Sequence, residues 1–256
     1  MDVNSAGYRI TEAAGRGNLD EVMRLLGLGI PADCRNSYGW TAFMMAVWNG
    51  MDRCADALFN AGADINALDT GGNSVLSHAC IRNEPECIKR ILKYGPDLDL
   101  CETNGDSPLY KAVKENNPEC VKLLLDAGAN VNKKGTGGWT PLHRASRQTG
   151  CDMCAKLLIE AGADINIKDN WGRTPLYIAA ESRLVSVMKS LIKAGADPLI
   201  QGISGFDSIQ TLKFTSPVKY KKYSGELIAL AEKVRTSRLE LEDMRKKTVT
   251  GYEFDI

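Results

Sequence analysis

A 33-residue period is the feature of this sequence that most constrains its fold. A glycine opens a similar phrase six times, at spacings of 33, 33, 33, 34 and 33 residues. This first series comprises Gly39, Gly72, Gly105, Gly138, Gly172 and Gly205. A second series with the same intervals comprises Gly29, Gly62, Gly95, Gly128, Gly162 and Gly195. Two series with one period predict stacked repeats, each burying its apolar face against its neighbours.

Each period carries the signals of two helices. Thr140 and Thr174 stand at expected N-caps, each followed by a proline at the first helical position. Alanines recur in the first helix, at Ala46, Ala79, Ala112, Ala145 and Ala179. Apolar pairs recur in the second helix, at Leu25/Leu26, Leu58/Phe59, Ile91/Leu92, Leu124/Leu125, Leu158/Ile159 and Leu191/Ile192. The second glycine series follows these pairs and predicts helix C-caps.

The repeated phrase resembles the ankyrin repeat. Residues Gly138 to Asn166 carry the pattern nearly in full, from TPLH to GADIN, and the resemblance extends over roughly residues 7–212. It implies a β-hairpin and two antiparallel helices in each repeat. The expected fold is therefore an all-α-type ankyrin-repeat solenoid of about seven units including the caps.

The period also divides the chain. We expect an N-terminal capping repeat at 1–34 and five repeats at 35–67, 68–100, 101–133, 134–167 and 168–200. A divergent C-terminal capping repeat at 201–235 precedes a charged helical or flexible tail at 236–256. In the C-terminal cap we expect a first helix from Ser208 to Phe214 and a wider connection after it. Ser224 would then cap an amphipathic helix whose apolar face comprises Leu227, Leu230, Ala231, Val234, Leu241 and Met244.

Charge and hydropathy favour an intracellular protein that acts on neither nucleic acid nor membranes. Lys plus Arg equals Asp plus Glu, 32 against 32, so no overall basic charge attracts nucleic acid. No run approaches the ~18 apolar residues that a membrane span needs, and the N-terminus lacks the pattern of a signal peptide. We expect a cytoplasmic or nuclear location and eight reduced cysteines.

Candidate catalytic residues are few. Cys151 and Cys154 form a CxxC motif, for which a redox or zinc role is the alternative to packing. Cys54, Cys87, Cys120 and Cys154 share one repeat position, which favours a core role. The histidines are His78 and His143, and in the family the histidine of TPLH bonds the backbone between repeats. With no nucleophile and acid gathered around them, we expect no enzyme activity, cofactor or metal.

Aromatic and polar residues at the hairpin tips and first-helix ends predict a binding surface. In the family these positions face the concave side of the array, and exposed aromatics are typical interface anchors. The alternative is that each ring packs on its own hairpin. The candidates are Tyr38, Trp40, Trp48, Asn49, Asn73, Ile81, Arg82, Asp106, Lys114, Glu115, Trp139, Arg147, Trp171 and Arg173.

The expected function is non-catalytic binding of a partner protein or peptide on this concave face by a monomeric solenoid. The alternatives are a substrate-recruiting adaptor, a kinase-inhibitor-like regulator and a scaffold fragment of a larger complex. The second rests on Asn36-Ser-Tyr-Gly39 followed by Met44-Met45, which is similar to the second repeat of ankyrin-type cyclin-dependent-kinase inhibitors.

Two further features carry expectations. Residues 213–247 hold ten basic and five acidic residues, which indicates either contacts to an acidic partner, nuclear signals or ordinary solvated helix surface. The resemblance also implies possible asparagine hydroxylation at Asn66, Asn132 and Asn166, positions that otherwise stabilise turns.

Overall fold

The computed structural model describes residues 3–101, 105–202, 205–225, 227–229, 232 and 236. The chain forms two compact units, residues 1–136 and 137–256, and each is described by itself. In both units the regular structure of the described residues is helical, as expected for an ankyrin-repeat solenoid. No helix in the described part is long and apolar enough to cross a membrane.

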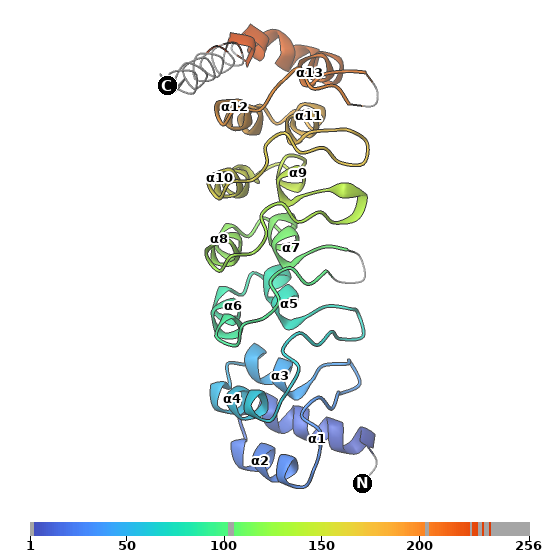
Figure 1. The fold of residues 1–256 in the computed structure, drawn as a ribbon, viewed down its shortest axis with the longest axis vertical. Coiled ribbons are helices and arrows are strands. Elements are labelled where there is room, and N and C mark those ends of the chain that lie inside the picture. The colour runs from blue at the N-terminus through green and yellow to red at the C-terminus, as the bar shows by residue number, and fades with distance from the viewer. Residues whose placement is uncertain are drawn as a thin grey trace, which may run out of the picture. The chain divides into compact units, whose positions relative to one another are not determined.

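The first unit consists of four helix pairs. They are α1 (Val3–Gly15) with α2 (Leu19–Gly27), α3 (Ala42–Trp48) with α4 (Asp52–Asn60), α5 (Val75–Arg82) with α6 (Pro85–Leu92), and α7 (Pro108–Lys114) with α8 (Pro118–Asp126). The first helices stack in the order α1, α3, α5 and α7, and α2 packs on α4 as α6 does on α8. First and second helices thus form two layers, with the connecting loops beyond the first layer (Figure 1).

The second unit continues the pattern. It contains α9 (Pro141–Ala145) with α10 (Asp152–Glu160), α11 (Pro175–Glu181) with α12 (Val185–Lys193), and α13 (Ser208–Thr215). A single 3-10 turn, η1 (Thr136–Gly138), spans the boundary between the units in the chain. Within this unit α9, α11 and α13 stack in one layer, and α10 packs on α12 in the other.

Hydroxyl and carboxylate side chains start the first helices. Thr140 and Thr174 each accept a hydrogen bond from the backbone N–H three residues on, which confirms both expected N-caps. Ser74, Ser107 and Asp207 cap α5, α7 and α13 in the same way. Each cap satisfies an N–H that the helix itself leaves without a partner and stabilises it by about 1 kcal/mol.

The core lies between the two layers. The recurring alanines of the first helix have no exposed surface, which lets neighbouring helices approach closely. In the apolar pairs the first member is buried in every repeat, whereas the second is mostly half-buried. Phe59 departs furthest from the expected apolar face, since 42% of its surface is exposed. It packs on the Tyr94 ring instead.

The turn between the two helices of a repeat has a left-handed residue at a fixed position. It is glycine at Gly17, Gly50 and Gly150 but a non-glycine residue at Asn83, Asn116 and Arg183. The extra residue of the 34-residue interval lies in the loop 146–151 between α9 and α10, as expected. Because this loop is longer, α9 has only five residues.

The loops that were expected to form β-hairpins have tight turns but little strand pairing. One isolated bridge, between Arg35 and Thr41, is the only β-pairing among the described residues. Side chains hold the loops instead. Asp33, Asn66, Asp99 and Asn166 each accept a hydrogen bond from a backbone N–H of the next repeat, at 2.8 to 3.0 Å.

The C-terminal cap begins its second helix earlier than expected. Residues 217–225 are already helical, so Ser224 lies inside the helix and does not cap it, and the predicted wide connection was wrong. Pro217 stands at the start, where proline's missing N–H costs no hydrogen bond. Leu227 is fully buried, as its place on the expected apolar face predicted. The other members of that face lie outside the described residues, as does nearly all of the expected tail.

Candidate functional site

The candidate site of the first unit is built on the loop before α3. The Asn36 side chain accepts hydrogen bonds from the backbone N–H groups of Tyr38 and Trp40, both at 3.0 Å. The backbone closes the same turn, because the N–H of Asn36 donates to the Trp40 carbonyl. Asparagine favours such turns because its side chain imitates a backbone carbonyl. The turn fixes the direction in which Tyr38 and Trp40 project.

The next loop lies directly against this turn. The backbone N–H and hydroxyl of Thr70 both donate to the Tyr38 carbonyl, at 3.2 and 2.9 Å. Gly39 has φ +77°, and a Cβ there would lie 2.6 Å from the Thr70 nitrogen. Only glycine therefore allows the two loops to approach this closely.

Trp40, Trp48 and His78 form an aromatic cluster between these loops and helices. The indole rings of Trp40 and Trp48 meet edge to face, with centroids 5.7 Å apart. The His78 ring from α5 lies 5.0 Å from Trp40 and 6.3 Å from Trp48. Edge-to-face pairs of this kind are favourable beyond their buried area. The two indoles, each half-buried, hold each other in place.

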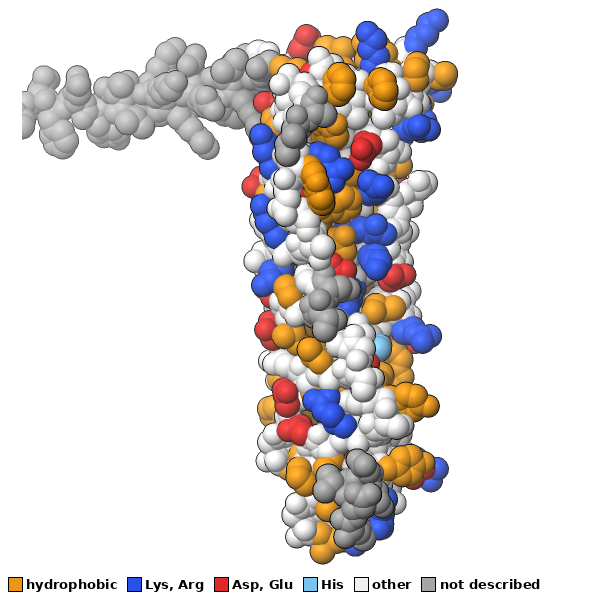
Figure 2. Space-filling model, turned by 90° about the vertical axis from the view of Figure 1, so that its right-hand side faces the viewer, with side chains coloured by type: hydrophobic (Ala, Val, Ile, Leu, Met, Phe, Trp, Pro, Cys, Tyr) orange, Lys and Arg blue, Asp and Glu red, His pale blue; other side chains and the backbone are white. Residues whose placement is uncertain are grey.

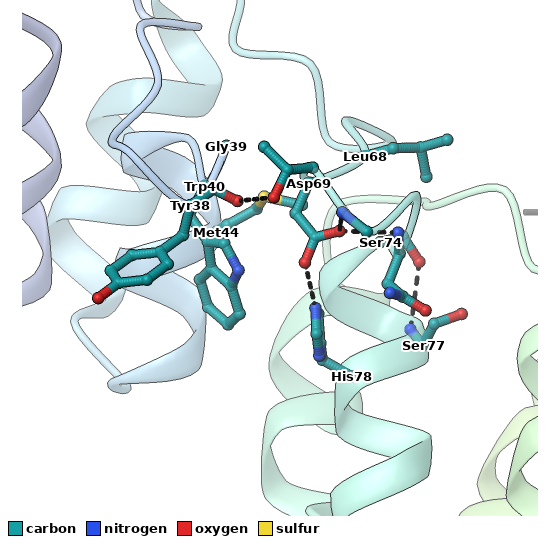
Figure 3. A network of polar contacts seen from close by, with 12 residues as sticks. Tyr38, Gly39, Trp40, Met44, Leu68, Asp69, Ser74, Ser77 and His78 are labelled. Atoms are coloured by element: carbon teal, nitrogen blue, oxygen red, sulfur yellow. Dashed lines mark hydrogen bonds and ion pairs between the residues drawn. The ribbon is translucent and has the colours of Figure 1, made fainter. Parts of the chain in front are cut away.

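Asp69 fixes the orientation of His78 (Figure 3). Its Oδ2 lies 2.7 Å from His78 Nε2, and its Oδ1 accepts the backbone N–H groups of Gly71 and Asn73. Burial would raise the pKa of the Asp69 carboxyl, but these hydrogen bonds and His78 outweigh it, so the pKa lies below its ordinary value. Asp69 is thus a structural anion that anchors one wall of the cluster.

These residues line a groove of about 610 Å³. Its lining brings together four of the predicted residues, Tyr38, Trp40, Trp48 and Asn49. It also includes residues that were not predicted as part of the binding surface, namely Asn36, Met45, Asp69, Thr70 and Gly71. Met45 could have been found from the register, because it stands one repeat before His78. Thr70 could not, since it enters the groove only through the contact between loops.

The other predicted residues of the first unit do not join this groove. Ile81 is half-buried, and Arg82, Lys114 and Glu115 are exposed at the ends of α5 and α7. Asp106 is buried, so its side chain is not on the surface. Asn73 is half-buried and accepts a hydrogen bond from Lys111 Nζ at 2.8 Å. Lys111 is itself buried, which lowers its pKa, and it stands one repeat after His78.

The predicted residues of the second unit form a different arrangement. The Arg173 guanidinium lies 5.6 Å from the Trp139 ring and 5.0 Å from the Trp171 ring. The Nε of Arg173 pairs with Oδ2 of Asp169 at 2.9 Å. The Arg147 guanidinium lies 5.9 Å from the centroid of the Trp139 ring. We call Trp139, Trp171, Arg147 and Arg173 the arginine–tryptophan cluster. Cation–π contacts cover part of the surface of both rings.

The loop side of each unit mixes side chains of several kinds. Hydrophobic side chains are interspersed with Lys, Arg and polar groups on it (Figure 2). Such a mixture suits recognition of protein surfaces better than it suits a continuous phosphate backbone.

The groups considered for chemistry have structural contacts. His143 Nε2 lies 3.0 Å from the Arg173 carbonyl, which confirms the expected bond between repeats. All eight cysteines are thiols, and Cys54, Cys87, Cys120 and Cys154 are buried, as the core interpretation predicted. Burial raises the pKa of Cys87 to about 12 and that of Cys120 to about 11, which makes both poor nucleophiles. Among the described residues no group of three His, Cys, Asp or Glu could hold a metal ion.

The asparagines named for hydroxylation lie in the turns between repeats. The side chains of Asn66 and Asn166 accept the backbone N–H groups of Asp97 and Asp197. The N–H of Asn132 donates to the Asn130 side chain. The side-chain contacts explain why asparagine stands at positions 66 and 166, and the modification of all three stays a prediction.

Profiles of known families match most of the chain. A profile of three ankyrin repeats matches residues 58–135, 76–169 and 134–201. A profile of many ankyrin repeats matches residues 10–53, and one of a single ankyrin repeat matches residues 38–70.

Solved structures agree with these profiles. The ankyrin repeat domain of Bcl-3, described as a unique member of the IkappaB protein family, is 27% identical with a TM-score of 0.72. The match covers 79% of this chain and 92% of that one. An ankyrin repeat domain from Acinetobacter baumannii AYE is 30% identical with a TM-score of 0.64, over 73% of this chain and 98% of that one.

A curated relative matches over a shorter stretch. The mitochondrial disaggregase of Bos taurus is 41% identical over 66 residues, 26% of this chain. That stretch is 10% of the disaggregase, so its activity is not assigned here. Because the repeat profiles match within residues 10–201, in register with the observed helix pairs, the chain belongs to the ankyrin-repeat family.

Proposed function

We propose that this chain binds a partner protein by seating a large apolar side chain of an extended segment in the aromatic groove. Ankyrin repeats generally mediate protein–protein interaction, and the fold is typically non-catalytic. The observation that carries the proposal is the groove itself, where Tyr38, Trp40 and Trp48 converge around about 610 Å³. The repeat register alone does not create such a convergence.

The lining determines the kind of side chain that fits. Two indoles, a phenol and the Met45 thioether supply an apolar, polarisable wall. Asn36, Asn49 and Thr70 supply amide and hydroxyl groups at the same groove. An apolar anchor surrounded by a polar rim is the usual anatomy of a binding hot spot. A peptide segment with a Leu, Met or Phe side chain would fill the apolar pocket, and its backbone N–H and C=O groups would hydrogen-bond to the polar rim.

The groove is also preorganised. The turn at Asn36, the loop contact at Gly39 and the Asp69–His78 contact hold the walls before any partner arrives. Little side-chain entropy remains to be lost on binding, which favours affinity. Tyr38 differs, because 73% of its surface is exposed, and it is available to close over a bound segment.

A photo-crosslinking experiment tests the location of the site. We would place p-benzoylphenylalanine at Tyr38 in the full chain and, as the matched control, at Tyr8, an exposed tyrosine of α1. Irradiation in cell extract should yield a discrete adduct from position 38 and not from position 8. Equal adducts from both positions, or none from either, would contradict the proposal.

Affinity measurements test the chemistry. Peptides selected on the wild-type chain from a random library should bind Trp48→Ala at least about tenfold more weakly, because the anchor loses a wall of its pocket. Phe59→Ala is the control, since it removes an exposed aromatic on α4 outside the groove. Circular dichroism verifies that the variants are folded. Equal losses in both variants would sink the idea.

The identity of the crosslinked protein then separates the regulatory roles. An adaptor, a kinase-inhibitor-like regulator and a scaffold would each use such a groove, with a ligase substrate, a kinase or several partners as the adduct. We further propose an intracellular setting, which the eight thiols support because persistent thiols are typical of reducing compartments.

A further inference from the structure

A second groove lies on the other layer of the second unit. It has a volume of about 420 Å³ and is lined by Val185, Ser186, Lys189, Ser190, Lys193 and Tyr223. The first five residues come from α12, and Tyr223 comes from the helical residues 217–225. We call this the lysine groove. It shares no lining residue with the aromatic groove of the first unit.

The two elements that form the lysine groove have a one-sided charge. α12 and residues 217–225 together contain five lysines and no aspartate or glutamate, and the next residue in the sequence is Glu226. Every other second helix, α2, α4, α6, α8 and α10, contains at least one acidic residue. α12 therefore differs from the other second helices in having no acidic residue to offset its lysines.

The difference in charge between α10 and α12 is clearest at one pair of equivalent positions. On α10, Lys156 and Glu160 form an ion pair at 3.7 Å. The equivalent positions on α12 are Lys189 and Lys193. The second member of the pair thus changes from an acidic to a basic residue, and two positive charges four residues apart repel each other on a helix.

Two lysine ammonium groups lie close to the Tyr223 ring, which lines the groove. The ammonium groups of Lys189 and Lys222 lie 5.2 and 5.0 Å from the centroid of its ring. Lys193 and Lys222 make no ion pair within the described part of the chain. The hydroxyl-bearing residues Ser186 and Ser190 line the same groove. Ammonium and hydroxyl groups in a recess are suited to receiving carboxylates.

We propose that the lysine groove binds an acidic peptide segment of a protein partner, with Lys193 and Lys222 pairing its carboxylates. A peptide fits better than a lipid surface because the groups line a recess between two helices. This site shares no residue with the aromatic groove and does not depend on it.

The test uses the full chain and a fluorescein-labelled peptide of alternating glutamate and glycine, with a glutamine analogue as the neutral control. Fluorescence anisotropy should show binding of the glutamate peptide that weakens as salt is raised. The double variant Lys193→Glu/Lys222→Glu should bind at least about tenfold more weakly, because it replaces two attractions with repulsions. Its thermal unfolding should be unchanged, since both side chains are exposed.

Matched controls keep the proposal falsifiable. Lys122→Glu/Lys156→Glu makes the same change of charge on the exposed faces of α8 and α10 and should alter affinity by less than about twofold. Equal weakening in both double variants would reduce the effect to net charge and overturn the proposal. Equal affinity for the glutamate and glutamine peptides would also overturn it.

Two other occupants have their own readouts. Binding to phosphatidylserine vesicles that depends on Lys193 and Lys222, without peptide binding, would assign the groove to lipid and overturn the proposal. Self-association in light scattering that only the groove variant abolishes, without peptide binding, would assign it to a second copy of the chain. Peptide binding in the aromatic groove should survive the Lys193/Lys222 changes, so the two sites can fail separately.

Discussion

The two units place tryptophans at the same repeat position and use them differently. Trp40 and Trp139 are equivalent in the register, as are Asn73 and Arg173. In the first unit the residue at this position is Asn73, and Trp40 packs against His78 and Trp48. A groove lies beside the two indoles. In the second unit Arg173 lies over Trp139 and Trp171. The register decides where an indole lies, and the neighbouring side chains decide whether it lines a groove or lies against a guanidinium. Trp171 keeps 51% of its surface exposed beside Arg173.

The largest expected loss of stability follows from removing the aspartate that contacts each cluster, Asp169 in the second unit or Asp69 in the first. Asp169→Ala should lower the free energy of unfolding by about 3 kcal/mol, because it removes the nearer of the two carboxylates that pair with Arg173 and the acceptor of two backbone N–H groups. The equivalent Asp69→Ala should cost about 2 kcal/mol, since the partner that it loses is an imidazole and not a guanidinium. Urea denaturation measures both. Equal costs would show that the charge of Arg173 is unimportant.

Exchanging the deciding residue in the second unit should open the arginine–tryptophan cluster. Arg173→Asn removes two cation–π contacts and the ion pair with Asp169, and should cost about 2 kcal/mol. It should also make Trp139 and Trp171 more accessible, which acrylamide quenching of tryptophan fluorescence detects. Arg147→Ala is the control, as it removes one longer contact from an exposed position. Unchanged quenching would mean that Arg173 does not cover the rings.

The reverse exchange should close the aromatic groove. Asn73→Arg places a guanidinium where Arg173 stands in its own repeat, over Trp40. Peptide affinity should fall by about tenfold, equivalent to 1.4 kcal/mol, while the chain remains folded. Asn73→Ala removes the bond from Lys111 without adding bulk and separates the two effects. If the alanine variant loses as much affinity as the arginine variant, the covering explanation is wrong.

The smallest effect is a pH dependence at Asp69. Because its pKa is lowered in the folded chain, Asp69 contributes stability above its ordinary pKa of 3.8, and this contribution is lost as the pH falls through the lower folded value. Asp69→Asn should therefore be about 1 kcal/mol less stable than wild type at neutral pH. The difference should shrink in acid below pH 3.8. Urea denaturation across this range measures it, and a constant difference would contradict the carboxylate's role.

Much of the fold follows from the sequence because repetition multiplies weak local signals. Thr140 and Thr174 mark helix starts, Ala46 and Ala79 mark close helix contacts, and each signal recurs with one period. The C-terminal cap lacks this support, since it has no following repeat to compare. A wide connection was expected there after Phe214, whereas the next helix begins at residue 217.

The site was predictable only in part, for a physical reason. The register placed Tyr38, Trp40 and Trp48 on one face, and they do line one groove. The opposite wall depends on which side chain pairs with which across two loops, as Asp69 does with His78 and Thr70 with Tyr38. The same register placed Trp139 and Trp171 beside Arg173, and the sequence did not indicate that they would contact it.

The turn side chains that accept hydrogen bonds from the next repeat have a consequence for cooperativity. Asn66 accepts the N–H of Asp97, and Asn166 that of Asp197, so neither turn is complete until the following repeat has folded. Nearest-neighbour coupling of this kind spreads unfolding from one repeat to the adjacent one, with the terminal repeats opening first. How long any one repeat stays folded is then set by the repeats beside it as much as by its own sequence.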